Sequence, residues 1–452
     1  MAASIDAQAG RLSFVVAAVS LFSSIFNFTC VGYATDSLGG VYKDLPGWAS
    51  SGANSAALWG SVVGMCLFGY LGDSLGRSRG MTLTLFLVVL GAVGSSVLTW
   101  GEESTLLYSL VIWRLVLGIG VGGVYPLSAV SVGESSPGTA ANKSKRVGFA
   151  YLATPVAVVT TPLVILFLLE VFPDPSQSWR IILGCGALPA VFTLFMSLRA
   201  KDGEEFTRAW EQRRHAHAPV AALRLERSTR LALVGTAGSW FVLDVAWYGI
   251  AVCMPQISRM VFETEDKHST ALYGALLLSL AIPGNVCMVL LSADHRLGRR
   301  RLQMLGFCMM AASFSAFAVA WQCQATRPVI IALFLCVVLT SNCGSGLTTY
   351  VLPQEVFPVD IRSSMNGISA AAGKVGGALG VTLFSPVVAH SGLPAAMYSA
   401  AACQILGALV TYAFIPVHRR DNCTGGGPGV LSPAGETHAG LLGTGGLAPT
   451  RA

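Results

Sequence analysis

An aspartate interrupts an otherwise apolar stretch of the chain, in the sequence SWFVLDVAWYG. Trp240, Asp244 and Tyr248 recur at four-residue spacing, so a helix would place an indole, a carboxyl and a hydroxyl on one face. Arg114 and Lys374 are the other ionisable residues deep within apolar stretches. A charge at the centre of a bilayer costs about 2.5–3.5 kcal/mol on insertion scales, so such residues usually face a cavity. We therefore predict a polar site inside a membrane, built around Asp244.

Two interpretations of Asp244 are open at this point. In the first, the carboxylate pairs with Lys374 and only holds two helices together. In the second, Asp244 changes its protonation state, while Lys374 supplies positive charge for an anion. An anion bound nearby would then change the proton affinity of the carboxyl, so that binding of the anion and of the proton would be coupled.

The composition indicates a polytopic membrane protein. Of 452 residues, 53% are hydrophobic and 12% are charged, whereas soluble domains carry about 25% charged residues. The eleven cysteines are scattered singly and form no CxxC pair, which favours small buried side chains over disulfides or metal ligands. His215 and His217 form only a weak metal-binding pattern. No metal or cofactor is therefore expected.

Twelve apolar stretches are long enough to span a bilayer as helices. They cover residues 12–34, 53–72, 81–100, 106–131, 148–171, 180–198, 231–254, 271–292, 303–322, 328–352, 366–388 and 394–416. A polar stretch with eight basic residues separates the first six from the last six. The expected organisation is an all-α chain with an N-terminal six-helix bundle (1–198), a cytoplasmic linker (199–230), a C-terminal six-helix bundle (231–416) and a disordered cytoplasmic tail (417–452).

The distribution of basic residues predicts the orientation. With the N-terminus in the cytoplasm, the outer loops keep only Lys43, Arg180, Arg259, Lys267 and Arg327. The other loops and tails hold most of the positive charge, which places both termini in the cytoplasm. The net charge of +6 follows from this topology, so a nucleic-acid partner is not expected.

A short charged turn occurs twice, once after the second span and once after the eighth. The first copy, GYLGDSLGRSRG, contains Asp73, Arg77 and Arg79, and the second, SADHRLGRRR, contains Asp294 and Arg299. A carboxylate in such a turn can meet an arginine or a helix N-terminus and latch one conformation of a moving protein. In the second copy His295 stands where Asp73 stands in the first, and the acid is displaced to Asp294. The second latch is therefore expected to be weaker or pH-sensitive.

A further charged group stands before the eleventh span, where Glu355, Asp360 and Arg362 are expected at the cytoplasmic mouth. We predict that these residues help to gate the protein. The predicted gating set is Asp73, Arg77, Arg79, Asp294, Arg299, Glu355 and Arg362.

The paired turns, the twelve spans and the central loop resemble the major facilitator superfamily. Within it, RLVLGIGVGGVYPLS, SWFVLDVAWYG, LPQEVFPVDIRSSMNGISAAAGKVGG and the Trp-Arg pair that opens the sixth span look like the phosphate:proton symporter family of fungal and plant permeases. The resemblance runs from about residue 60 to 390. It implies import of phosphate with protons by alternating access, in the plasma membrane, by a protein that works as a monomer.

The resemblance also implies roles for single residues. The family's substrate-binding positions are occupied here by Tyr125, Trp240, Asp244, Tyr248 and Lys374. Asp244 and Arg114 would serve proton coupling, and Arg114 would also pack its helix against a neighbour.

Four positions depart from the family pattern. Val124 replaces an aspartate, Asn27 stands nearest to the first-helix aspartates, Leu152 replaces a glutamine, and Gly346 falls at or near a tenth-helix asparagine. A site with fewer acids could belong to a weakly coupled symporter, a uniporter or a carrier of a phosphate ester or other organic anion. A non-transporting nutrient sensor is the other alternative. No catalytic pattern is visible, so the chain is not expected to be an enzyme.

Overall fold

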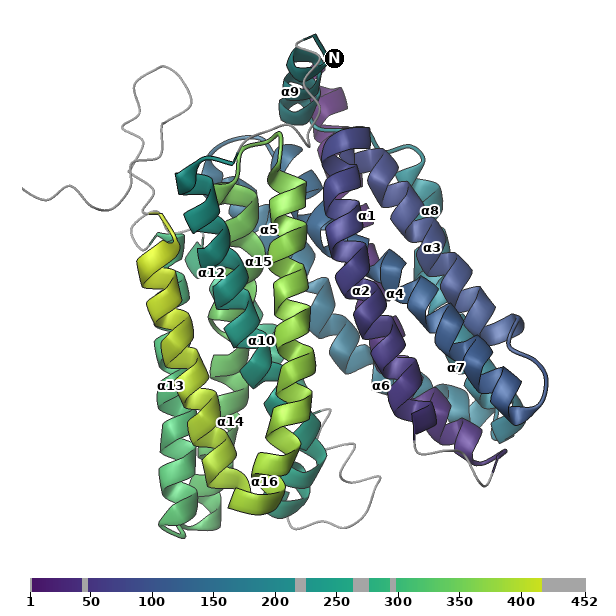
Figure 1. Ribbon diagram of the computed structural model, residues 1–452, viewed down its shortest axis with the longest axis vertical. Coiled ribbons are helices and arrows are strands. Elements are labelled where there is room, and N and C mark those ends of the chain that lie inside the picture. Colours follow the sequence, from purple (N-terminus) through teal and green to yellow (C-terminus); the bar gives the residue numbers. More distant parts are fainter. Residues whose placement is uncertain (1, 43–47, 216–224, 263–275, 293–297, 417–452) are drawn as a thin grey trace, which may run out of the picture.

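The computed structural model describes residues 2–42, 48–215, 225–262, 276–292 and 298–416. The described residues form helices and no strands, so the all-α fold class is confirmed (Figure 1). The helices are α1 Ala2–Gly39, α2 Trp48–Leu75, α3 Arg77–Val97, α4 Glu103–Glu134, α5 Ala140–Tyr151, α6 Ala153–Val171, α7 Pro175–Cys185, α8 Ala187–Ser197, α9 Glu204–His215, α10 Arg227–Phe262, α12 Ala281–Ser292, α13 Arg299–Gln322, α14 Arg327–Asn342, α15 Ser345–Val356 and α16 Arg362–Phe414.

Several predicted spans are interrupted or joined in the structure. The fifth, sixth and tenth spans are each divided into two helices, α5 and α6, α7 and α8, and α14 and α15. The eleventh and twelfth spans follow each other directly within α16 as two helices, which meet at a non-helical turn at Gly392, where φ is 79°. In the described part, 11 helices are long and apolar enough to cross a membrane, and Leu276–Ser292 is a shorter apolar helix. These elements correspond to the twelve predicted spans of an integral, multi-pass membrane protein.

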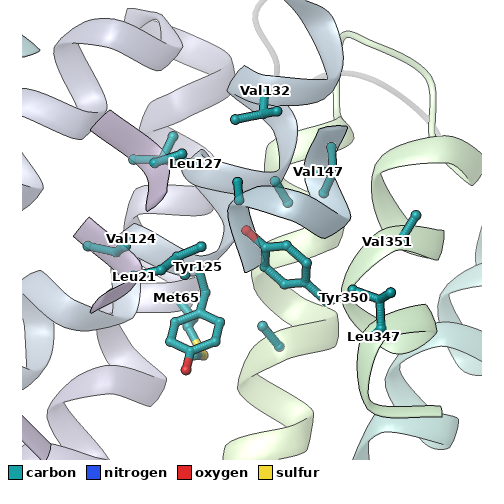
Figure 2. Packing of buried hydrophobic residues seen from close by; sticks show 14 of the residues in the cluster. Leu21, Met65, Val124, Tyr125, Leu127, Val132, Val147, Leu347, Tyr350 and Val351 are labelled. Carbon is teal, nitrogen blue, oxygen red and sulfur yellow. The ribbon is translucent and has the colours of Figure 1, made fainter. Parts of the chain in front are cut away.

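Two groups of helices lie side by side (Figure 1). Helices α1 to α8 form one group and α10 to α16 the other, and the two approach each other near α9 and diverge toward the opposite end. One buried apolar cluster crosses between the groups and includes Val124 and Tyr125 from α4 and Leu347, Tyr350 and Val351 from α15 (Figure 2). The groups are therefore packed against each other at mid-depth and toward α9.

The central linker is partly helical, because α9 lies within it. The rest of the linker at 216–224, which includes His217, and the tail at 417–452 lie outside the described residues. The bounds of the two bundles and the disorder of the tail stay predictions.

Small residues set the distance between α10 and α16. A Cβ added at Gly376 would lie 2.2 Å from the carbonyl oxygen of Phe241, and one added at Gly380 would lie 2.1 Å from that of Val245. Both contacts are with backbone, so a larger side chain would force the helices apart. This close approach brings the face of α10 that carries Asp244 against α16.

Candidate functional site

A cavity of about 150 Å³ lies between the two groups of helices. That volume is roughly ten times the ~10–15 Å³ that one water needs, so a small hydrated ion has room. Its lining includes Tyr125 and Tyr151 from the first group and Trp240, Asp244, Tyr248, Asn285, Asn342, Gly346 and Lys374 from the second. The structure thus brings all five predicted substrate-binding residues to one cavity.

Lys374 is a nearly buried cation surrounded by aromatic rings. Its side chain is 6% exposed, and its ammonium donates a hydrogen bond to the hydroxyl of Tyr248. The same nitrogen lies 4.8 Å from the centre of the Tyr248 ring and 5.4 Å from that of Tyr125. Ring faces attract a cation without neutralising it, so the positive charge remains available to an anion.

Asp244 is also nearly buried and lines the same cavity as Lys374. The two charged groups do not form an ion pair within 4.0 Å, and no hydrogen bond joins the Asp244 carboxyl to another described residue. The structure therefore gives no support to the interpretation of Asp244 as a structural partner of Lys374. The side chain of Asp244 lines the cavity, and its role in proton coupling stays a prediction.

The four departures from the family pattern have different surroundings. Val124 is fully buried in the apolar cluster, and Leu152 packs against that cluster, so neither lines the cavity. Tyr151, next to Leu152, does line it. Gly346 lines the cavity as well, and the nearest atom to a Cβ built there is 3.9 Å away, the carbonyl oxygen of Ser341. Of the four, Gly346 alone therefore leaves open space at the site.

Arg114 and Asn27 meet away from the cavity. The guanidinium of Arg114 is fully buried and donates to the backbone oxygen of Asn27 at 2.5 Å. Asn27 in turn donates through Nδ2 to the carbonyl oxygen of Gly186 at 2.8 Å. These contacts tie α1 to α4 and to the junction of α7 and α8, which agrees with the packing role expected for Arg114. The structure does not bring Arg114 together with Asp244, and its role in proton coupling stays a prediction.

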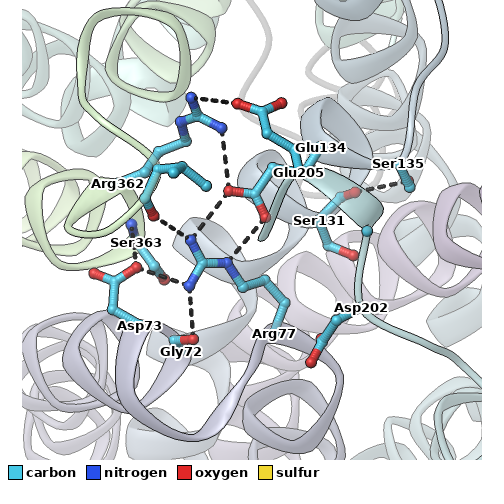
Figure 3. A network of polar contacts seen from close by, with 12 residues as sticks. Gly72, Asp73, Arg77, Ser131, Glu134, Ser135, Asp202, Glu205, Arg362 and Ser363 are labelled. Atoms are coloured by element: carbon cyan, nitrogen blue, oxygen red, sulfur yellow. Dashed lines mark hydrogen bonds and ion pairs between the residues drawn. The ribbon is translucent and has the colours of Figure 1, made fainter. Parts of the chain in front are cut away.

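A charged cluster joins the two groups of helices at the α9 end. Arg77 forms ion pairs with Asp73 at 2.8 Å and with Glu134 at 3.0 Å, and donates to the carbonyl oxygen of Val359 at 2.8 Å (Figure 3). Asp73 accepts hydrogen bonds from the backbone nitrogens of Ser363 at 3.1 Å and Ser364 at 2.7 Å. Those nitrogens are in the first turn of α16, where a carboxylate is favoured by the helix dipole. The first charged turn is thus bound to the start of the eleventh span.

Arg362 extends this cluster to the linker helix α9. It pairs with Glu134 at 3.1 Å and with Glu205 at 3.0 Å, and Glu205 also pairs with Lys143 at 2.9 Å. Burial would raise the pKa of Glu205, but Arg362 and Lys143 outweigh it and hold the pKa of this carboxyl below its ordinary value. Glu205 therefore stays ionised at neutral pH and holds α9 against both groups.

The second charged turn also contacts the other group of helices, through fewer residues than the first. Arg299 pairs with Glu355 at 3.2 Å and donates to the hydroxyl of Ser144 at 2.9 Å, and Glu355 also contacts that hydroxyl. This links α13 and α15 to α5. Asp294 lies outside the described residues, and Arg79 is exposed and forms no hydrogen bond or ion pair with a described residue.

Some residues of both sites were missed by the sequence analysis. Glu134, Glu205 and Ser144 complete the charged contacts, and Asn285 and Asn342 line the cavity. A signal existed for Glu134 and Asn285, because each is a polar side chain at the end of, or within, an apolar stretch. For Glu205, in a linker rich in charges, the sequence offered no signal.

Comparison with known proteins identifies the class. A family model described as Major Facilitator Superfamily matches residues 12–381, and the chain belongs to this superfamily. The predicted resemblance is confirmed, and the chain is a secondary transporter of a small-molecule substrate and not an enzyme.

Several proteins with established names are similar in sequence to this chain. The chain is 33% identical to "Inorganic phosphate transporter PT2" of Toxoplasma gondii over 90% of this chain and 72% of that protein. It is 27% identical to "Probable inorganic phosphate transporter 1-6" of Arabidopsis thaliana over 88% of this chain and 90% of that protein. Among solved structures, the proton:xylose symporter XylE superposes with a TM-score of 0.76 at 19% identity, over 91% of this chain and 97% of that one. At that identity, the likeness to XylE concerns the fold alone.

Proposed function

We propose that the chain imports inorganic phosphate together with protons, by alternating access of its two helix bundles to the central cavity. The observation that carries this proposal is that Asp244 and Lys374 line one cavity without pairing with each other. The names of the relatives, which are inorganic phosphate transporters, support phosphate as the substrate.

The chemistry of the cavity suits a tetrahedral oxyanion. The ammonium of Lys374, the indole of Trp240 and the hydroxyls of Tyr125 and Tyr248 are donors that can approach different oxygens of one anion. Because Tyr248 accepts from Lys374, its own hydroxyl proton remains free to donate. An anion bound beside Asp244 favours the protonated carboxyl, so anion and proton bind together and leave together.

The charged cluster supports a gating mechanism. It closes the α9 end of the molecule, which the basic residues of the loops assign to the cytoplasm. In this proposal the protein is closed to the cytoplasm while the cluster is formed, and both termini are cytoplasmic. The moving units in this proposal are residues 1–198 and 231–416 of a monomer in the plasma membrane, and loss of the cluster accompanies opening inward.

Uptake by the purified full chain in proteoliposomes tests the proposal. We expect uptake of radiolabelled phosphate that an inward proton gradient accelerates, because the proton and the anion enter together. Asp244→Asn should fold normally but lose uptake or its response to the gradient. Wild-type rates and gradient dependence in Asp244→Asn would contradict the role of this carboxyl.

A small phosphate monoester is a second candidate substrate, favoured by the open space beside Gly346. It would compete with labelled phosphate more strongly than unlabelled phosphate does. Binding of phosphate without any uptake would instead favour the nutrient sensor.

A further inference from the structure

The cavity wall carries two amide side chains that come from α12 and α14. Asn285 is 5% exposed and donates through Nδ2 to the carbonyl oxygen of Ala281 at 2.8 Å. Asn342 donates in the same way to the carbonyl oxygen of Val338 at 2.9 Å. Turning either amide over would place its oxygen against a carbonyl oxygen, so the backbone acceptors determine the orientation of both groups.

This orientation leaves the amide oxygens without a partner. Neither Oδ1 atom accepts a hydrogen bond from a described residue, and neither is sealed inside the protein, in contrast to the Oδ1 atom of Asn27. Since Asn285 and Asn342 line the cavity, its open space is where these acceptors can be satisfied. An acceptor next to bound substrate requires a donor on that substrate.

The anion itself can supply that donor only if it is protonated. Phosphate carries at least one P–OH group near neutral pH, whereas sulfate carries none. Lys374 and the tyrosine hydroxyls bind oxygens of either anion, so they do not distinguish the two. Sulfate would place an oxygen without a proton against the fixed amide oxygen, which would then accept no hydrogen bond. This lowers the affinity for sulfate by about ten-fold to a hundred-fold.

We infer that Asn285 is a specificity-determining residue, which accepts a hydrogen bond from a P–OH group and so selects a protonated oxyanion over sulfate. The inference rests on the proposed function and deepens it. None of the residues predicted for the site lies on α12, the helix that carries Asn285.

Competition during phosphate uptake tests this role. Arsenate carries As–OH groups and sulfate carries none, so the ratio of their half-inhibitory concentrations measures selection for a protonated anion. We expect wild-type protein in proteoliposomes to bind sulfate at least about ten-fold more weakly than arsenate. Asn285→Leu, which has similar size and no acceptor, should reduce this ratio about ten-fold or more.

Further variants separate this role from a structural one. Asn285→Asp keeps an acceptor and should keep the ratio even if total uptake falls. Asn142→Leu makes the same substitution at an exposed position on α5 and should change nothing. Asn285→Ala replaces Asn285→Leu in this test if the leucine variant does not fold. It should lower the ratio of half-inhibitory concentrations by the same factor.

The outcomes distinguish the two proposals. Phosphate uptake by Asn285→Leu or Asn285→Ala with an unchanged ratio would overturn the role of Asn285 and leave phosphate transport standing. Absence of phosphate uptake by the wild-type protein would overturn both.

Discussion

Lys374 is held at the cavity by aromatic side chains and not by a carboxylate. Its ammonium contacts the hydroxyl of Tyr248 and the ring of Tyr125, and these groups orient the charge while leaving it uncompensated. A buried cation without an anion at contact distance is unfavourable. Binding of an anion would therefore be favoured at this point of the cavity.

Removal of this charge should weaken substrate binding. We expect Lys374→Ala to raise the KM for phosphate by about ten-fold or more, since hydrogen bonds to charged groups contribute about 1.5–3 kcal/mol. Uptake kinetics in proteoliposomes measure the change. Lys201→Ala, which removes an exposed lysine outside the membrane, is the matched control. An unchanged KM in Lys374→Ala would show that the lysine does not contact the anion.

At the scale of the elements, the site depends on how closely α10 and α16 pack. Trp240 lies against Gly373, where an added Cβ would be 2.4 Å from the indole Cδ1 atom. Tyr248 lies against Gly377, where the corresponding distance to its ring is 2.7 Å. Glycines on α16 therefore set the positions of Trp240 and Tyr248, two of the predicted substrate-binding residues. They also set the distance between the axes of α10 and α16.

A methyl group in this contact should disturb the site. Gly376→Ala would place a Cβ 2.2 Å from the Phe241 carbonyl oxygen, and overpacking of this kind costs about 1–3 kcal/mol. We expect a lower midpoint of thermal unfolding in detergent and weaker phosphate uptake. Gly32→Ala is the control, because a Cβ built at Gly32 would meet no atom within 4 Å beyond the adjacent backbone of its own helix. Equal stability of the two variants would argue against close packing of α10 on α16.

At the scale of the whole molecule, the charged cluster joins three parts of the chain that are distant in sequence. Arg77 and Glu134 belong to the first group of helices, Arg362 to the second, and Glu205 to the linker. A buried network of this kind is damaged strongly when one partner is lost, because the remaining charges are left uncompensated. It is therefore suited to hold one conformation until the helices separate.

The arginines of the first charged turn should differ sharply in importance. Arg77 is buried between Asp73 and Glu134, so Arg77→Gln should destabilise the closed state by about 3–5 kcal/mol. Arg79→Gln, at an exposed position, should change stability by no more than about 0.5 kcal/mol. Hydrogen exchange of residues 204–213 and 362–369 should speed up in the first variant only. Similar exchange in both variants would contradict the proposed latch.

Much of the fold and part of the site could be predicted because the relevant signals are local. Hydropathy over about 20 residues reveals a span, and four-residue spacing places Trp240, Asp244 and Tyr248 on one helix face. The fold class and the superfamily are confirmed. The functional roles of the site residues stay predictions.

The sequence by itself determined which stretches are apolar enough to span a membrane and which residues share a helix face, because backbone hydrogen bonds fix the period of a helix whatever surrounds it. Only the tertiary structure decided that Asp244 and Lys374 share a cavity without pairing, and that Arg77 is buried while Arg79 is exposed. These outcomes depend on the rotation and spacing of helices far apart in the chain. Side-chain packing across their interfaces sets both quantities, and no local pattern contains that information.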